Sequence, residues 1–292
     1  MIVKIGTRRS DLAIWQAEFV RDELIRHYPD IEVELVGVTT EGDRTLDVPL
    51  SEKGGKGLFL KELEKKLLDH SVDLAVRCMM NVKITDPVGL HIPVICERAN
   101  PFDAFVSTHY ENLESLPENA RVGTCSLRRQ SILRHRFPDL EVGNLRGNVN
   151  RRLQCLDNGD FDAIILAAAG LHRLDMADRI RQVIASEVML PAVGQGAIGV
   201  QCREDDKQTT ELIEPLNHLE TQRRVHAERA ANARLGGGCH VPLGAFAELE
   251  NGVLQLRGFV GDPDGSQFIF ADMQGAEDAP DQIGHALAEK LL

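Results

Sequence analysis

Cys239 follows three consecutive glycines in the segment LGGGCHVPLG, residues 235–244. Glycine adds no side chain and accepts a positive φ, so a loop of this composition lets a ligand approach the backbone and the neighbouring thiol closely. This pattern favours a thiol that meets a ligand. The alternative is a buried cysteine in a glycine turn, because free cysteine is among the most buried residue types. The residues alone leave both interpretations open.

The second group with chemical potential is a concentration of arginine. Residues 121–152 contain eight arginines and no lysine against two acidic residues, a local excess of six positive charges. Within the segment TCSLRRQ, Ser126 is suited to cap a helix whose first turn carries Arg128 and Arg129, so backbone amides and guanidinium groups face the same way. Such a site suits carboxylates or phosphates, because arginine forms planar bidentate hydrogen bonds. The alternative is a solvated basic surface.

A third segment, GGKG at 54–57, places Lys56 at the start of an expected helix. It lacks the spacing of a Walker loop and the Ser or Thr that follows the lysine there. A flexible glycine-rich lid and an anion site are both compatible with this pattern.

The elements that must position these residues alternate between strand and helix. In the first hundred residues, apolar spacing predicts helices over 10–27 and 57–70 between strand-like runs. The alternation of strand and helix patterns resumes after a polar stretch at 97–103, with a helix expected over 126–136. This alternation predicts crossover connections and two α/β domains with largely parallel sheets.

The remainder of the chain differs in composition and in the order of its expected elements. The segment LPAVGQGAIG at 190–199 combines Pro with three glycines and predicts a turn-rich crossing rather than a regular element. From about residue 219 the pattern predicts a helix over 220–235, two strands and a final helix. These form a small third domain.

Composition excludes several classes of protein. The chain has 292 residues, 43% apolar and 27% charged, which is typical of a globular protein with more than one core. Its apolar runs are too short to span a bilayer, and its N-terminal sequence does not resemble a secretory signal, so we expect a cytoplasmic protein with no membrane partner. The six cysteines include no CxxC pair and predict no metal site. The net charge of −12, one Trp and two Tyr argue against nucleic acid as a partner.

Eight motifs, in order and at the expected spacing, resemble the porphobilinogen deaminase (hydroxymethylbilane synthase) family. They are IGTRRSDLAIWQA, GGKGLFLKELE, ICERANPFDAFVS, VGTCSLRRQ, LRGNVNRRL, DAIILAAAGLHRL, LPAVGQGAIGVQCR and LGGGCHVPLG. The resemblance implies an α/β fold with two periplasmic-binding-protein-like lobes, mixed or parallel sheets, and a small third α+β domain. It also implies domain 1 at 1–98 and 197–216, domain 2 at 102–192 and domain 3 at 219–292, with the active site between the first two.

The resemblance also implies a function in tetrapyrrole (haem) biosynthesis. Four porphobilinogen units condense head to tail, each losing ammonia to give an electrophilic azafulvene, on a dipyrromethane cofactor that a thioether attaches to Cys239. Every ring carries an acetate and a propionate, which explains the clustering of arginine. The positions that would bind these carboxylates of cofactor, porphobilinogen and linear pyrrole intermediates are Arg8, Ser10, Lys56, Thr124, Ser126, Arg128, Arg129, Arg146, Arg152 and Arg173.

One loop departs from the family. Where the family reads HSMKDVP, this chain reads RCMMNVK at 77–83, so that five of seven positions differ: Arg77, Cys78, Met80, Asn81 and Lys83. The family's catalytic carboxylate falls on Asn81. A carboxylate within ~4 Å of a developing positive charge stabilises it by about 4 kcal/mol at an effective dielectric near 20. Losing that stabilisation slows a reaction by about 10³.

Other groups offer little compensation for Asn81. Asp86 lies five residues on, and Lys83 is a candidate only for the displaced cation. A further family lysine falls on Glu52, beside Lys53.

Three alternatives to an enzyme of reduced activity remain open from the sequence. The first is a catalytically inactive paralogue or variant that binds linear pyrroles or another polycarboxylate. The second is a periplasmic-type solute binder, in which Cys239 has no role. The third is a nucleic-acid binder that uses the arginine segment. The family resemblance favours a monomer.

Overall fold

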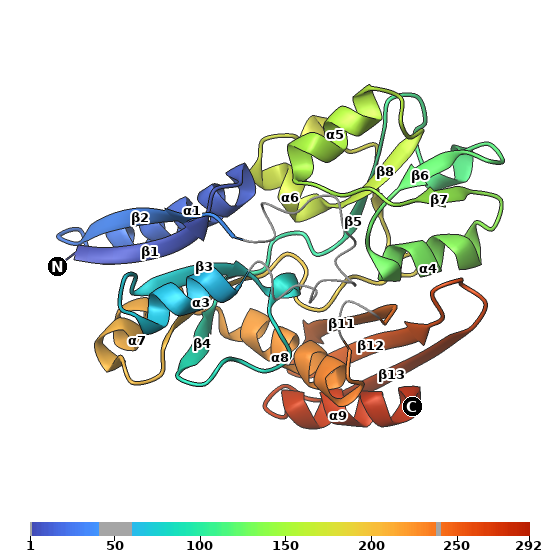
Figure 1. The fold of residues 1–292 in the computed structure, drawn as a ribbon. Helices are drawn as coiled ribbons and strands as arrows, with labels where there is room; N and C mark the ends of the chain where they lie inside the picture. Colours follow the sequence, from blue (N-terminus) through green and yellow to red (C-terminus); the bar gives the residue numbers. More distant parts are fainter. Residues whose placement is uncertain (1, 41–59, 238–240) are drawn as a thin grey trace. The chain divides into compact units, whose positions relative to one another are not determined.

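The computed structural model describes residues 2–40, 60–237 and 241–292 (Figure 1). Lys56 and Cys239, together with Glu52 and Lys53, lie outside these residues. The chain divides into two compact units, Met1–Arg98 with Ala197–Arg223 (unit 1) and Ala99–Gly196 with Arg224–Leu292 (unit 2). No helix within the described ranges has both the length and the apolar character needed to cross a membrane.

Unit 1 is built on a five-stranded mixed sheet in the order β2-β1-β3-β10-β4. The pairs β1–β2 and β1–β3 are parallel, whereas β10 runs antiparallel to both β3 and β4. Its strands are β1 (Ile2–Arg8), β2 (Glu32–Val38), β3 (Leu74–Cys78), β4 (Leu90–Ile95) and β10 (Ile198–Arg203). Its helices are α1 (Asp11–His27), α3 (Lys61–Leu68) and α7 (Lys207–Ile213), with short 3₁₀ turns at Met79–Asn81 and Glu214–Leu216.

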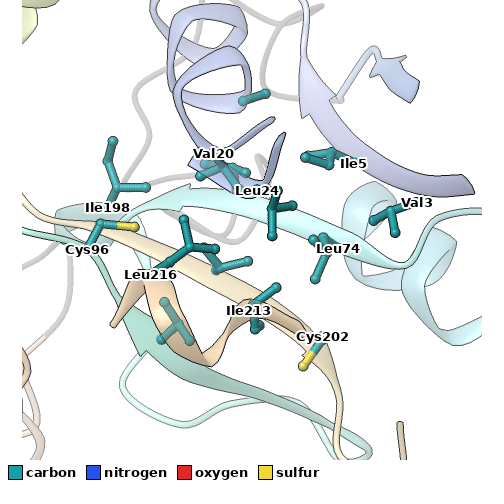
Figure 2. Close-up of a cluster of buried hydrophobic side chains, with 14 residues drawn as sticks. Val3, Ile5, Val20, Leu24, Leu74, Cys96, Ile198, Cys202, Ile213 and Leu216 are labelled. Atoms are coloured by element: carbon teal, nitrogen blue, oxygen red, sulfur yellow. The ribbon is translucent and has the colours of Figure 1, made fainter. Parts of the chain in front are cut away.

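The core of unit 1 follows from the two periodicities of its sequence. Val20 and Leu24 lie one helical turn apart on α1 and face the sheet, where they meet Ile5 and Leu74 (Figure 2). All four side chains are fully buried. Burying each such side chain stabilises the fold by about 1.5–3 kcal/mol. This packing fixes β3, and therefore the point at which the altered loop begins.

Unit 2 contains a second five-stranded mixed sheet, in the order β7-β6-β8-β5-β9. Strand β6 is parallel to β7 and β8, and β5 is antiparallel to β8 and β9. The strands are β5 (Asp103–Ser107), β6 (Arg121–Gly123), β7 (Glu141–Gly143), β8 (Ala163–Ala167) and β9 (Gln182–Ile184). The helices are α4 (Leu127–Arg136), α5 (Val149–Asp157) and α6 (Ala168–Arg173), with 3₁₀ turns at Leu113–Ser115 and Ala177–Arg179.

The C-terminal part of unit 2 is a three-stranded antiparallel sheet with helices. Its elements are α8 (Leu219–Arg234), which begins in unit 1, β11 (Leu243–Glu250), β12 (Val253–Gly261), β13 (Phe268–Ala276) and α9 (Pro280–Leu291). The sequence predicted two strands here, which is wrong, because β11 begins Leu-Gly-Ala-Phe-Ala and its small residues have weak strand propensity. Full pairing of β11 with β12 compensates for that weakness.

The fold class is confirmed as α/β with mixed sheets and a small third α+β part. Within unit 2 the third sheet shares a core with the second, because Phe246 and Phe259 pack with Phe105 and Ile132. The division of the sequence into three domains stays a prediction.

Candidate ligand site

Two helices of unit 2 begin at the same edge of its five-stranded sheet. Parallel strands β6 and β7 end at the paired residues Gly123 and Gly143, so the loops that lead into α4 and α5 start side by side. As predicted, Ser126 caps α4, its Oγ accepting a hydrogen bond from the Arg129 amide at 3.5 Å. Asn148 caps α5 in the same way. The positive ends of two helix dipoles therefore accompany the arginine-rich segment, an arrangement that favours bound anions.

Arg152, in the first turn of α5, joins these two loops. Its Nε donates to the Gly147 carbonyl at 2.9 Å, and its Nη2 donates to Cys125 Sγ at 3.5 Å. Burial lowers the pKa of Arg152, and the charges of Arg129 and Arg146 lower it further, against the opposing effect of Cys125. Arg129 and Arg146 are thus each close enough to Arg152 for their positive charges to repel its own. A carboxylate placed among them relieves that repulsion.

Arg128 and Arg129 have a different environment from the one that the sequence predicted. Each is only 4% exposed, and both bind Asp103, which is fully buried at the start of β5. Asp103 Oδ2 lies 2.7 Å from Arg128 Nη1, and Asp103 Oδ1 lies 2.7 Å from Arg129 Nη2. These two arginines are therefore neither a solvated surface nor two open guanidinium forks.

Both arginines also donate to main-chain carbonyls, whereas the buried Nε of Arg128 has no hydrogen-bond partner among the residues that the structure describes. Arg128 Nη1 donates to Leu190 at 2.6 Å, and Arg129 Nη1 donates to Ile165 at 2.9 Å. Burial raises the pKa of Asp103, but the charges and hydrogen bonds of the two arginines outweigh it, so its pKa is lowered overall. Two cations share one anion here, which leaves one positive charge in excess.

Sequence reasoning missed Asp103 and its partner Gln195. Gln195 Nε2 donates to Asp103 Oδ1 at 3.0 Å, so the amide completes the cluster. The available signal was a carboxylate at the head of the apolar run DAFVS, all five residues of which are buried. A charged residue in a fully buried strand requires an opposite charge nearby.

Three further predicted carboxylate ligands have distinct positions. Arg173, at the end of α6, is 7% exposed and donates from Nη2 to the Gly196 carbonyl at 2.7 Å. Arg8 ends β1 in unit 1 and is half-buried. Ser10 occupies the N-cap position of α1 without a side-chain capping hydrogen bond. Within unit 2 the structure gathers Thr124, Ser126, Arg129, Arg146 and Arg152, whereas Arg8 and Ser10 lie in unit 1 with Asn81.

The altered loop continues directly from β3. Asn81 ends the 3₁₀ turn Met79–Asn81 and is half-buried. Arg77 is 4% exposed and donates from Nε and Nη2 to Gln201 Oε1 on the neighbouring strand β10, at 3.0 and 2.6 Å. Its Nη1 has no hydrogen-bond partner among the residues that the structure describes. Burial lowers the pKa of Arg77 to about 10, against the attraction of Glu64 and Asp86.

Lys83, the last residue of this loop, forms an ion pair with Glu64. Its Nζ lies 3.0 Å from Glu64 Oε2 on α3, and Glu64 is 8% exposed. The loop therefore contributes two cations, Arg77 and Lys83, and the charge of Glu64 acts on both of them. Asn81 itself offers an amide oxygen without charge, so the turn Met79–Asn81 holds no anion at the position predicted for a catalytic acid.

Comparison with known sequences covers nearly the whole chain. Residues 3–211 match the family model described as "Porphobilinogen deaminase, dipyromethane cofactor binding domain", and residues 222–292 match "Porphobilinogen deaminase, C-terminal domain". The chain belongs to the porphobilinogen deaminase family. The resemblance read from its eight motifs is confirmed, including a domain that binds the dipyrromethane cofactor in this family.

Three solved structures that are similar to this chain have low sequence identity to it. A methionine-binding lipoprotein of Bacillus subtilis is 10% identical, with a TM-score of 0.46 over 74% of this chain and 90% of its own. The methionine-binding protein MetQ is 13% identical, with a TM-score of 0.49 over 80% and 93%. A periplasmic substrate-binding protein of Coxiella burnetii is 13% identical, with a TM-score of 0.46 over 73% and 91%.

Proposed function

We propose that this chain is a hydroxymethylbilane synthase of haem biosynthesis that joins four porphobilinogen units head to tail. In each round the bond between the aminomethyl carbon and nitrogen breaks, ammonia leaves, and that carbon bonds to the free α-carbon of the preceding pyrrole, which gives up its proton. The observation that carries the proposal is the match of residues 3–211 and 222–292 to both parts of the porphobilinogen deaminase family.

The residues present fit a dipyrromethane cofactor. Its acetate and propionate groups require several cations in a confined space, and Arg152 supplies that environment together with Arg129 and Arg146, whose charges act on it. We assign its thioether to Cys239, the thiol in the glycine-rich segment outside the described residues. When bound, the cofactor supplies the pyrrole carbon on which the chain of rings grows.

The side chains of this protein then bind and orient carboxylates. In unit 2, Thr124, Ser126 and Arg146 lie on the loops into α4 and α5, next to the amides of both helix starts. Arg128, Arg129 and Arg173 add buried positive charge, and Arg152 adds a half-buried one. Arg8, Ser10 and Lys56 are assigned to the same task in unit 1. Porphobilinogen and linear pyrroles are the ligands that this set of donors suits.

Asn81 limits the rate in this proposal. No ionised carboxylate follows β3 at the position that would stabilise positive charge on a pyrrole nitrogen, which costs about 4 kcal/mol, or about 10³ in rate. Arg77 and Lys83 add positive charge to the same loop. We therefore propose a strongly reduced turnover.

The intact mass of the purified protein, before and after incubation with porphobilinogen, tests the proposal. A starting mass that exceeds the sequence by one dipyrromethane, followed by steps of one porphobilinogen less one ammonia, is the expected result. A protein that carries no pyrrole and never gains mass contradicts the enzymatic proposal.

The altered loop supports a second candidate, an inactive relative that binds linear pyrroles or another polycarboxylate. The Lys83–Glu64 ion pair and the Arg77–Gln201 hydrogen bonds hold the loop in an ordered, acid-free form. A pyrrole-bearing protein whose mass does not increase favours this candidate.

We further propose a cytoplasmic monomer. The five described cysteines are free thiols, as expected for a reducing compartment.

A further inference from the structure

Two of the chain's passages between its units lie at 98/99 and 196/197. On the unit 2 side these passages touch, because the Ala99 amide donates to the Gly196 carbonyl at 3.2 Å. Gly196 has a φ of +87°, and a Cβ there would lie 2.6 Å from the Ala99 oxygen. Only glycine permits this approach without strain. The segment LPAVGQGAIG, which the sequence marked as a crossing, is thus held against residues 99–101.

Gln195 connects this contact to the arginine cluster. The side chain is fully buried. Its Nε2 donates to the Pro101 carbonyl at 2.7 Å and to Asp103 Oδ1 at 3.0 Å, and its Oε1 accepts from Arg128 Nη2 at 3.4 Å. The Gln195 amide, which lies in the second crossing segment, therefore bonds to Pro101 beside the first crossing. It also bonds to Asp103 and Arg128, the two partners of a buried ion pair.

The cluster's arginines also bond directly to the second crossing segment. Arg128 reaches the Leu190 carbonyl at 2.6 Å, and Arg173 reaches the Gly196 carbonyl at 2.7 Å. From the other side, Glu228 Oε2 accepts a hydrogen bond from the Gly194 amide at 2.7 Å. Residues 190–196 are thus secured at several points, two of which are arginines proposed to bind ligand.

We propose that Asp103 and Gln195 are positioning residues that couple the arginine cluster to the two chain crossings. Arg128 Nη1 lies within hydrogen-bond distance of both Asp103 Oδ2 and the Leu190 carbonyl, so a ligand carboxylate that bonds to this nitrogen competes with Leu190 for it. The crossing segments are then less firmly held, and the range of motion between the units increases. The coupling to ligand rests on the proposed function, whereas the clamp on the crossings does not.

The first test measures distances between the units. Spin labels are attached to non-natural amino acids at the exposed positions Asp30 in unit 1 and Glu118 in unit 2, so that every native cysteine is retained. Double electron–electron resonance then gives the distribution of distances between the two labels. Gln195→Met, which keeps side-chain volume but removes three hydrogen bonds, should broaden the distribution without ligand. Gln182→Ala, a unit 2 glutamine that bonds to the Leu113 amide, is the matched control and should not. Equal distributions in wild type and Gln195→Met overturn the clamp.

The second test uses the unaltered protein, so it does not depend on folding of a variant. Hydrogen exchange of the Ala99 amide, which is bonded to Gly196, is followed with and without benzene-1,2,4,5-tetracarboxylate as the probe. The coupling predicts faster exchange at residues 99, 100 and 194–196 when the probe slows exchange at 124–152. Slower exchange at 124–152 with no change at the crossings overturns the coupling.

The two proposals fail separately. A probe that leaves exchange at 124–152 unaltered contradicts the carboxylate site of the proposed function, and with it the coupling. The width of the ligand-free distance distribution still decides whether Gln195 holds the crossings.

Discussion

The two carboxylate oxygens of Asp103 lie 2.7 Å from a nitrogen of Arg128 and a nitrogen of Arg129, so one buried acid serves two neighbouring arginines. The arginines thereby gain fixed orientations that an exposed pair would not have. The two arginines together carry one more positive charge than Asp103 neutralises, which preserves their attraction for a ligand carboxylate. A structural role and a binding role are therefore compatible in the same side chains.

Asp103→Asn should destabilise the protein in a pH-dependent way. Removing one partner of a buried ion pair costs about 3–5 kcal/mol. The pKa of Asp103 is lowered in the folded state, so its contribution is complete above the unfolded value of about 3.9 and is lost as the pH falls towards the folded value. Urea unfolding between pH 7 and pH 3 should show a shallower acid loss in the variant. The control Asp157→Asn, which removes an exposed ion pair with Arg179, should retain the wild-type slope.

Gly196→Ala tests the close approach of the crossing segments. A matched control is Gly159, which has a similar φ of +80° but no atom within 4 Å of a built Cβ, against 2.6 Å to Ala99 O for Gly196. Gly159→Ala should cost about 1 kcal/mol for the left-handed backbone alone. Gly196→Ala should cost about 3 kcal/mol or more, because a backbone clash adds to that strain. Equal losses in urea unfolding would show that the contact does not constrain the glycine.

Helices were the part of the fold that the sequence predicted well. The helix expected over 10–27 is α1, Asp11–His27, and that expected over 126–136 is α4, Leu127–Arg136. Both have apolar residues at helical spacing and a serine at the N-cap, which are local features. The strand count of the third part was wrong because β11 depends on its partner β12 and not on its own composition.

The same distinction between local and long-range features applies to the candidate site. Ser126 as a cap and the gathering of arginines were predictable, because they depend on neighbours in sequence. The pairing of Asp103 with Arg128 spans 25 residues and that with Gln195 spans 92, and no local pattern specifies such contacts. The partners of Arg77 were hidden for the same reason, since Gln201 lies 124 residues away.

Arg129→Lys should not be a neutral exchange. Lysine keeps the charge but loses the planar set of donors that reaches both Asp103 and the Ile165 carbonyl, so a loss of about 1–3 kcal/mol in unfolding free energy is expected. Arg151→Lys is the matched control, because Arg151 holds the equivalent capped position of α5 but is exposed. Calorimetric titration with benzene-1,2,4,5-tetracarboxylate should show weaker binding for Arg129→Lys only. Wild-type affinity and stability in Arg129→Lys would contradict the bidentate role.

Cys239→Ser should remove the covalent pyrrole without disturbing the fold. Serine is a poorer nucleophile than a thiolate, so the intact mass of the variant should equal that of its sequence. Cys125→Ser is the control, because Cys125 lies beside Arg152 in the arginine cluster but is not the proposed attachment point. Its mass should still include one dipyrromethane. A pyrrole that persists in Cys239→Ser would assign the attachment to another cysteine.

Asn81→Asp should raise the rate of porphyrin formation from porphobilinogen by about 10³, because it returns a negative charge to the turn after β3. Asn158→Asp, at the C-cap of α5 in unit 2, adds the same charge elsewhere and should leave the rate unchanged. The increase should fall as the pH drops below about 4, where an aspartate in an ordinary environment becomes protonated. An Asn81→Asp protein that is folded, carries its pyrrole and still does not turn over contradicts the account in which position 81 alone limits the rate. The cations Arg77 and Lys83 then become the next residues to replace, since they are the charges that the altered loop adds to that turn.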